Sequence, residues 1–227
     1  MVKYANIHKA RFIDRPNRFI AQVEINGDVQ VAHVKNTGRC KELLIPGAHV
    51  FVAENNDPGR KTRYDLVVVE KGKMLVNIDS QAPNKVVKGW LETGGIYAKP
   101  TLIHSEKKYG NSRVDFYIED QDKKAFIEVK GVTLENEGVA AFPDAPTERG
   151  IRHIHHLMDV IKEGYEAYLI FVIQFKPVEY FVPNDVTHPE FGKALRDAAR
   201  SGVKILAYDC NIAPDAMTMD QKVPVHL

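Results

Sequence analysis

The sequence of 227 residues predicts an α/β protein of two domains, a small β-barrel over residues 1–83 and an α/β domain over residues 84–227. Two observations support this division. Short β-branched segments separated by turn residues fill the first part, whereas strand-like and helical segments alternate in the second. The charge changes too: residues 1–85 hold 14 Lys and Arg against 9 Asp and Glu, and the remaining 142 residues hold 17 against 21.

Strand-like segments predict the barrel in the first part. They are rich in Val and Ile, partly alternate between apolar and polar residues, and are separated by turns such as Asn26-Gly27-Asp28. About five short strands within some eighty residues suggest a small barrel of the OB type. The segments are 17–25, 29–34, 48–53, 64–71 and 73–79, and "NTGRCKELLIP" at 36–46 predicts a turn leading into a short helix.

The second part alternates strands with helices, which predicts helices packed on a central mixed sheet. In the helical segment 147–164, for example, apolar residues recur on one face and Gly164 supplies a stop. The predicted strands are 113–119, 124–130, 166–175 and 204–210, and the predicted helices are 84–93, 101–110, 147–164 and 189–201.

Three charged residues lie within two of these strands: Asp115, Glu128 and Lys130. Residues two apart on a strand point to the same face, so Glu128 and Lys130 project side by side, and we expect Asp115 to face them from the adjacent strand. Two carboxylates beside a lysine suit Mg²⁺ or Mn²⁺, which takes oxygen ligands and activates a bound water. The alternative is that all three are surface charges of a hairpin.

Basic residues are candidates for contacts with a nucleic-acid backbone, since point charges along a barrel face can follow a polyanion. In the second part, a helix N-terminus adds backbone N–H groups and its dipole to Arg149 and His153. A solvated surface is the alternative for both sets. Zinc binding by His153, His155 and His156 is not expected, because three ligands within four helical residues cannot converge. The candidates of the first part are Arg11, Arg15, Arg18, Lys35, Arg39 and Lys41.

Several segments, taken together, resemble one known family. Asp115 followed by "EVK" at 128–130 resembles the PD-(D/E)xK nuclease core, with Val114 where that pattern has Pro; alone, such a pattern is common by chance. The wider set is similar to the sugar fermentation stimulation protein A family, from about residue 11 to about residue 210. The segments are "NTGRCKELLIPG" (36–47), "SRVDF" (112–116), "FIEVKGVTL" (126–134), "AFPDAPTERGIRHI" (141–154) and "FVIQ" (171–174).

The resemblance implies an OB-like barrel, a PD-(D/E)xK nuclease-like α/β domain, DNA binding without sequence specificity and a regulatory link to maltose metabolism. In such nuclease cores an acidic residue often precedes the first core strand and a Gln can stand near the site, which makes Glu106 and Gln174 candidates. A solvated helix charge and a buried amide satisfied by backbone groups are the respective alternatives.

We therefore expect a DNA-binding protein whose metal site is suited to phosphodiester hydrolysis. Two alternatives stay open: a non-enzymatic DNA-binding transcriptional accessory with a vestigial nuclease site, and a phosphodiesterase acting on RNA or on a small nucleotide. Steep loss of DNA affinity with rising salt would indicate a backbone binder.

Composition points to the cytoplasm. Cys40 and Cys210 lack metal-ligand spacing, which favours a reducing compartment without a disulfide framework. The longest apolar run, "YLIFVI" at 168–173, is far too short to span a bilayer, so we expect no membrane partner.

Overall fold

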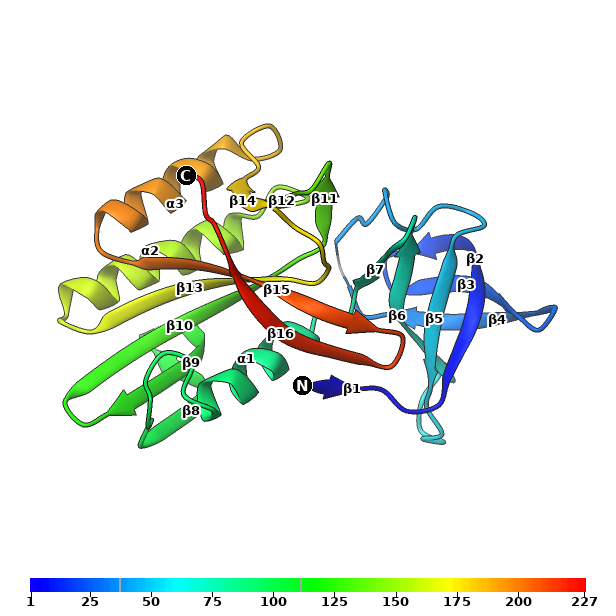
Figure 1. Cartoon of the computed structure of the whole chain (residues 1–227), viewed down its shortest axis with the longest axis horizontal. Coiled ribbons are helices and arrows are strands. Elements are labelled where there is room, and N and C mark those ends of the chain that lie inside the picture. Colours follow the sequence, from blue (N-terminus) through cyan, green and yellow to red (C-terminus); the bar gives the residue numbers. More distant parts are fainter. Residues whose placement is uncertain (37, 111) are drawn as a thin grey trace.

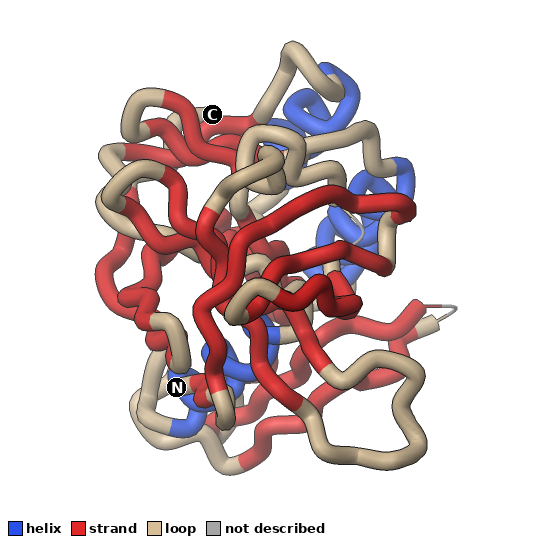
Figure 2. Tube along the Cα trace, turned by 90° about the vertical axis from the view of Figure 1, so that its right-hand side faces the viewer, coloured by secondary structure: helices blue, strands red, loops and turns tan. Residues whose placement is uncertain are grey.

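The computed structural model describes residues 1–36, 38–110 and 112–227, and it folds as a β-barrel and an α/β domain placed side by side (Figure 1). Strands are more abundant than helices along the chain (Figure 2). The barrel contains β2 (Ile7–Asn17), β3 (Ile20–Ile25), β4 (Asp28–Val34), β5 (His49–Glu54) and β6 (Tyr64–Lys71), and β7 (Met74–Asn77) extends β6 as a hairpin.

The barrel closes through five strands in the order β4-β3-β2-β5-β6, because β6 pairs back onto β4 in parallel. The strands alternate as the sequence predicts: Val23 and Ile25 of β3 are buried, whereas Glu24 between them is exposed. The predicted small barrel of the OB type is confirmed.

Strand β2 was not predicted. Its sequence "IHKARFIDRPN" mixes basic with apolar residues, yet Ala10 and Phe12 alternate with exposed Lys9 and Arg11. The period of two residues places the apolar side chains in the barrel and the basic ones in solvent. This alternation of apolar and basic residues was the sequence signal that could have predicted β2.

The short helix expected within 36–46 does not form. The backbone N–H groups of Leu43 and Leu44 both donate to the carbonyl of Cys40, at 3.2 and 2.9 Å, which makes a single turn. Cys40 has a left-handed φ of 45° and Pro46 has no N–H to donate, so the segment between them is too short for a helix. Thr37 lies outside the described residues.

The second domain has a mixed sheet of seven strands in the order β1-β16-β15-β13-β10-β9-β8, in which β10, β13 and β15 run parallel. Besides the predicted strands, β1, β8, β11, β12, β14 and β16 are present. The elements are β1 (Val2–Lys3), α1 (Ala82–Glu92), β8 (Leu102–Tyr109), β9 (Ser112–Asp120), β10 (Lys123–Val132), β11 (Leu134–Asn136), β12 (Val139–Phe142), α2 (Glu148–Lys162), β13 (Glu166–Ile173), β14 (Tyr180–Pro183), α3 (Pro189–Arg200), β15 (Lys204–Ala213) and β16 (Ala216–Val223).

Helices cover both faces of this sheet. Helices α2 and α3 lie on one face and α1 on the other (Figure 1). Ile127 and Val129 of β10 pack with α1, whereas Phe126 packs toward α2 and α3. The predicted α/β domain with a central mixed sheet and its helices at 84–93, 147–164 and 189–201 are confirmed.

The helix predicted over 101–110 is wrong. Leu102–Tyr109 is the edge strand β8, antiparallel to β9. Most of its side chains are exposed and polar, so no apolar face with a helical period stabilises a helix there. The open edge of β9 instead supplies backbone partners, and lysines on such an edge discourage further strand addition.

The chain begins in the second domain. Strand β1 pairs with β16, and Val2 is buried in an apolar cluster with Val86 and Leu91 of α1. Residues 2–3 therefore do not belong to the barrel expected over 1–83. The burial of Val2 against α1 is the physical reason for their position.

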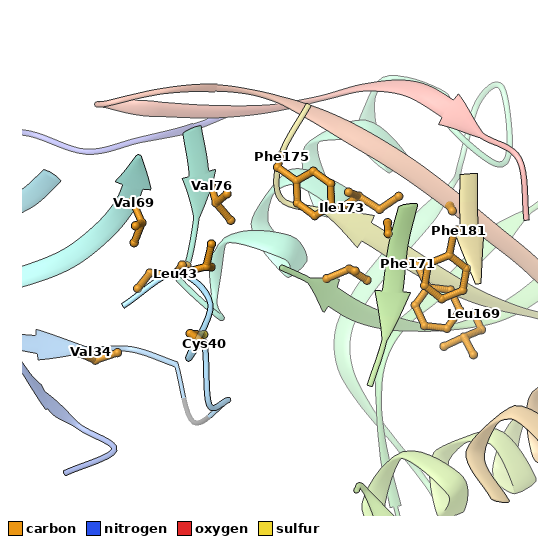
Figure 3. Close-up of a cluster of buried hydrophobic side chains, with 14 of the residues drawn as sticks. Val34, Cys40, Leu43, Val69, Val76, Leu169, Phe171, Ile173, Phe175 and Phe181 are labelled. Carbon is orange, nitrogen blue, oxygen red and sulfur yellow. The ribbon is translucent and has the colours of Figure 1, made fainter. Parts of the chain in front are cut away.

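The two domains share one apolar core. A continuous cluster runs from Val34 and Leu43 of the barrel to Phe171 and Phe175 of the second domain (Figure 3). Phe175 follows β13 and is fully buried. The barrel is thus packed onto the sheet rather than tethered to it.

None of the helices within the described ranges is both long and apolar enough to cross a membrane.

The shared core predicts that the two domains unfold together. Phe175→Ala removes a fully buried ring and is expected to lower the free energy of unfolding by about 3–5 kcal/mol. Phe19→Ala is the matched control, because 51% of Phe19 is exposed. Chemical denaturation measures the free energy of unfolding of both variants, and calorimetry shows whether each unfolds in one transition. Two separate transitions, with only the later part of the chain destabilised by Phe175→Ala, would contradict the shared core.

Candidate active site and nucleic-acid interface

Asp115 stands where the ladder between β9 and β10 stops. The last antiparallel pair is Phe116 with Ile127, and the next position of β9 is Asp115. Its carboxylate Oδ2 accepts the backbone N–H of Val129 at 2.8 Å. The side chain thus takes over the hydrogen bonding of the ladder, which brings it beside the strand that carries Glu128 and Lys130.

A residue of α1 fixes the other oxygen of Asp115. Asn84 Nδ2 donates to Asp115 Oδ1 at 2.9 Å. Burial, and next the negative charge of Glu128, raise the pKa of the Asp115 carboxyl above its usual range. Asn84 was not among the predicted site residues; its place just after Pro83, at the start of a helix, was the only signal.

Glu128 is 3% exposed and is held by two side chains. Lys130 Nζ donates to Glu128 Oε1 at 2.6 Å, and His153 Nδ1 bonds the same oxygen. Burial acts to raise the pKa of Glu128, but the hydrogen bond of His153 and the charge of Lys130 outweigh it, so the pKa is lowered. Glu128 is therefore an ionised, buried carboxylate.

His153 belongs to this cluster rather than to an open helix face. It lies on α2, and Arg149 Nε donates to its Nε2 at 3.2 Å. Because Nε2 accepts, the neutral ring carries its proton on Nδ1, which donates to Glu128. Arg149 is exposed, but its guanidinium orients the ring. The expected phosphate contacts of Arg149 and His153 stay a prediction.

The donor set fits a cation that keeps several waters. Within residues 1–36, 38–110 and 112–227, no group of three or more His, Cys, Asp and Glu side chains is arranged to hold a metal ion. Asp115 and Glu128 supply two carboxylates, and no donor in the same ranges reaches Glu128 Oε2. Burial and, next, the charge of Glu128 raise the pKa of Asp115, and a cation would relieve the repulsion between the two carboxylates. Mg²⁺ and Mn²⁺ suit such a site, because Mg²⁺ commonly uses one or two carboxylates.

Two further candidates lie elsewhere. Glu106 is on β8, its side chain is 67% exposed, and its carboxylate accepts from Arg113 at 3.1 Å. Gln174 is 1% exposed, and its amide nitrogen donates to the carbonyls of Asn77 and Asp79 at 3.0 and 3.2 Å. The contacts of this nitrogen agree with the alternative given above, a buried amide whose hydrogen bonds are satisfied by backbone groups. Catalytic roles for Glu106 and Gln174 stay predictions.

A cavity of about 420 Å³ on the barrel gathers several of the basic candidates. Arg18, Arg39 and Lys41 are exposed along it, and Ala145 closes it from the second domain. We call this cavity the basic groove; it is lined by Arg15, Asn17, Arg18, Gly38, Arg39, Lys41 and Ala145. Arg11 lies on β2, where it pairs with Glu24 of β3 and His49 of β5, and it does not line the basic groove.

Arg15 organises the groove from within. Its Nη1 donates to the carbonyls of Gly38 and Arg39 at 2.9 Å each, and its Nη2 donates to those of Arg18 and Asn36 at 2.6 and 2.7 Å. With both terminal nitrogens occupied, Arg15 shapes the backbone that presents Arg18 and Arg39. The sequence could not show this, since the partners are carbonyls brought together by the fold.

Gly38 permits close contact between the domains. A Cβ there would lie 2.6 Å from Asp144 Oδ2, which accepts the N–H of Arg39 at 2.9 Å. The hydrogen bond between Arg39 and Asp144 therefore holds this part of the barrel against the segment before α2.

Lys35 is paired with two buried carboxylates. Its Nζ lies 3.0 Å from Asp65 Oδ2 and 3.6 Å from Asp79 Oδ2, and Arg60 forms a two-pronged ion pair with Asp65. Asp65 is 4% exposed. Burial acts to raise its pKa, but the bonds with Arg60 and Lys35 outweigh burial and lower it. These pairs stabilise the fold, and a phosphate contact by Lys35 stays a prediction.

A closed five-stranded barrel packed on a mixed sheet that carries an acidic pair and a lysine defines a class of two-domain proteins, in which an OB domain precedes a mixed α/β domain. The model of the "Sugar fermentation stimulation protein RE domain" matches residues 81–216, and that of the "SfsA N-terminal OB domain" matches residues 13–78. The chain belongs to the sugar fermentation stimulation protein family.

Curated relatives and a solved structure agree with this assignment. Sugar fermentation stimulation protein homologs of Ruminiclostridium cellulolyticum and Clostridium beijerinckii are 54% and 57% identical over 226 residues, covering 100% of this chain and of each relative. The structure of Pyrococcus furiosus SfsA in complex with Ca²⁺ superposes with a TM-score of 0.88 at 27% identity, covering 100% of this chain and 98% of that one.

The buried carboxylate of Asp65 makes stability depend on pH. Because its pKa is lowered on folding, its pairs stabilise the fold above the unfolded pKa of about 4, and this contribution is lost as the pH falls further. Asp65→Asn is expected to lower the free energy of unfolding by about 3 kcal/mol at pH 7. It should also make the free energy of unfolding fall less steeply as the pH decreases below about 4. Urea titrations at several values from pH 7 to about pH 3 measure both effects. Exposed Asp28→Asn is the matched control, and an unchanged acid limb in Asp65→Asn would contradict the assignment.

Proposed function

We propose that this protein binds nucleic acid through the basic groove and hydrolyses phosphodiester bonds at a divalent-cation site held by Asp115 and Glu128. The convergence of Asp115, Glu128 and Lys130 at the end of the β9–β10 ladder carries the proposal. Buried charges are costly, and the fold retains these with dedicated partners from two helices. Such clusters are typical of catalytic sites.

The residues around the proposed cation site would have different roles. Bound Mg²⁺ or Mn²⁺ would supply a Lewis acid for the phosphate and lower the pKa of a coordinated water. Asn84 and the N–H of Val129 orient Asp115, and His153 orients Glu128. Lys130, 16% exposed, would hold the attacking water or a phosphate oxygen.

The complex of Pyrococcus furiosus SfsA with Ca²⁺ supports a divalent cation for this family. Ca²⁺ and Mg²⁺ both take oxygen ligands, and carboxylates are their usual protein donors. The same reasoning favours Mg²⁺ or Mn²⁺ over Zn²⁺ here, since the donors are oxygens and the nearby His153 is already engaged with Glu128 and Arg149.

The basic groove suits binding without sequence specificity. Arg18, Arg39 and Lys41 are long, exposed cations on a barrel, which favour phosphate oxygens over base edges. DNA is the partner that we propose. The link to maltose metabolism implied by the family is a further proposal, tested by comparing growth on maltose with and without the gene.

Cleavage is the direct test of the site. Labelled single- and double-stranded DNA and RNA incubated with Mg²⁺ or Mn²⁺ should be cut, and a chelator should abolish cutting. Lys130→Ala should slow cutting by about 10²–10³-fold with binding intact, because the charge beside the reacting phosphate is lost. Lys124→Ala, exposed on the same strand, is the matched control.

Three results of that assay separate the candidates. Cutting of DNA that survives Lys130→Ala would contradict the assigned site. Tight DNA binding without cutting under any metal would favour the non-enzymatic accessory. Cutting confined to RNA or to small nucleotides would favour the other phosphodiesterase.

Salt dependence tests the groove. Each phosphate contact adds about 0.9 to the slope of log affinity against log salt for duplex DNA and about 0.7 for a single strand. Arg39→Ala and Lys41→Ala should each weaken binding and reduce the slope by about that amount. Exposed Lys99→Ala, on the loop after α1, should change neither. Unchanged slopes for both groove variants would remove the groove from the interface.

A further inference from the structure

A second cavity, of about 320 Å³, lies where the two domains meet. We call it the junction cavity. Asn36, Gly38 and Ser80 line it from the barrel side, and the ends of β10 and β13 line it with Thr133 and Gln174. The segment 141–147, which leads into α2, completes the wall. Four of the segments that resemble the family thus meet at one cavity.

One wall carries a buried hydrogen-bond acceptor. Gln174 Nε2 is surrounded by three acceptors, the carbonyls of Asn77 and Asp79 and the Oδ1 of Asn77. This fixes the orientation of the amide and turns Oε1 toward Gly131, where a Cβ would overlap with it. Across residues 1–36, 38–110 and 112–227, the hydrogen bonds of this amide all run from Nε2. Oε1 lies in a residue that lines the cavity, so it can accept a hydrogen bond from a bound group.

The opposite wall carries a second acceptor. Asp144 Oδ2 accepts from Arg39, and nothing in the described part of the chain donates to Oδ1 or forms an ion pair with the carboxylate. A negative charge there repels a phosphate. The group that enters is therefore a neutral one that donates hydrogen bonds. Phe142 and Leu134 add an apolar surface beside it.

The position of the cavity connects it to the basic groove. Gly38 and Ala145 line both, so the two spaces adjoin. A strand whose phosphates follow Arg39 and Lys41 brings its next nucleoside to the junction cavity. Its volume lies in the range of sites for small ligands, about 300–1,000 Å³, and is sufficient for one nucleoside.

We propose that the junction cavity receives one unpaired nucleoside of a single-stranded substrate through its hydrogen-bond donors, an exocyclic amino group of the base or a sugar hydroxyl. This inference rests on the proposed nucleic-acid binding. Adenine and cytosine present amino groups, whereas thymine presents two carbonyl oxygens around one ring N–H. Gln174 Oε1 and Asp144 thus favour adenine or cytosine and disfavour thymine.

The test measures affinity rather than cleavage. Labelled homopolymers of dA, dC and dT of roughly twelve nucleotides, together with oligo(rA) and oligo(rU), are titrated in the presence of a chelator. The wild type should bind dA or dC about five-fold more tightly than dT, as one additional hydrogen bond allows. A preference for ribose that is equal across bases would assign the cavity to the sugar hydroxyl instead.

Asp144→Asn is the decisive variant, because the amide is isosteric and can still accept from Arg39 while presenting a donor to the cavity. It should remove most of the preference, and Asp122→Asn, in the exposed turn between β9 and β10, should leave it intact. Ala145→Phe narrows the cavity from a loop position and should weaken binding of the preferred homopolymer most. Thermal melting confirms that each variant is folded.

The failures of the two proposals differ. Tight, salt-sensitive binding of every homopolymer with equal affinity would overturn the cavity assignment and leave the groove intact. A preference unchanged by Asp144→Asn would overturn it as well. Absence of binding to any oligonucleotide would overturn the proposed function and this inference with it.

Discussion

Gln174 is the point on which the arrangement of the two domains depends. Its backbone N–H donates to Val132 of β10, its carbonyl accepts from Asn77, and its side chain bonds Asn77 and Asp79. One residue therefore joins two parallel strands of the sheet to β7, the strand that extends β6 of the barrel. With the shared apolar core around it, this junction sets where the basic groove, the junction cavity and the acidic cluster lie relative to one another.

The charged residues of the interior follow a single rule. Glu128 and Asp65 are both buried carboxylates with a lowered pKa, and each is held by at least two cationic or hydrogen-bonding partners. The Asp65 cluster is closed, since Arg60 and Lys35 occupy both of its oxygens. The Glu128 cluster is open, because its partners share one oxygen and Asp115 faces it with a raised pKa. Closed clusters stabilise a fold, and open ones are suited to a ligand.

The sequence predicted what local periodicity controls. Alternation along two strands was enough to place Asp115, Glu128 and Lys130 together, and the barrel strands and three helices follow from the same patterns. It did not reveal what depends on distant partners. Three of the four carbonyls around Arg15 come from a turn more than twenty residues away, and Asn84 reaches Asp115 from another element. Strand β8 was mistaken for a helix because a polar edge strand has no pattern of its own and forms only beside β9.

The pairing of β1 with β16 joins residues 2–3 to residues 216–217, which lie far apart in the sequence. The barrel that follows β1 can close from local segments, but the sheet that receives β1 is complete only once β16 exists. During synthesis β1 therefore stays unpaired until β16 has been made and has left the ribosome. The seven-stranded sheet, and with it the covered surface of α1 around Val2, can form only after that point.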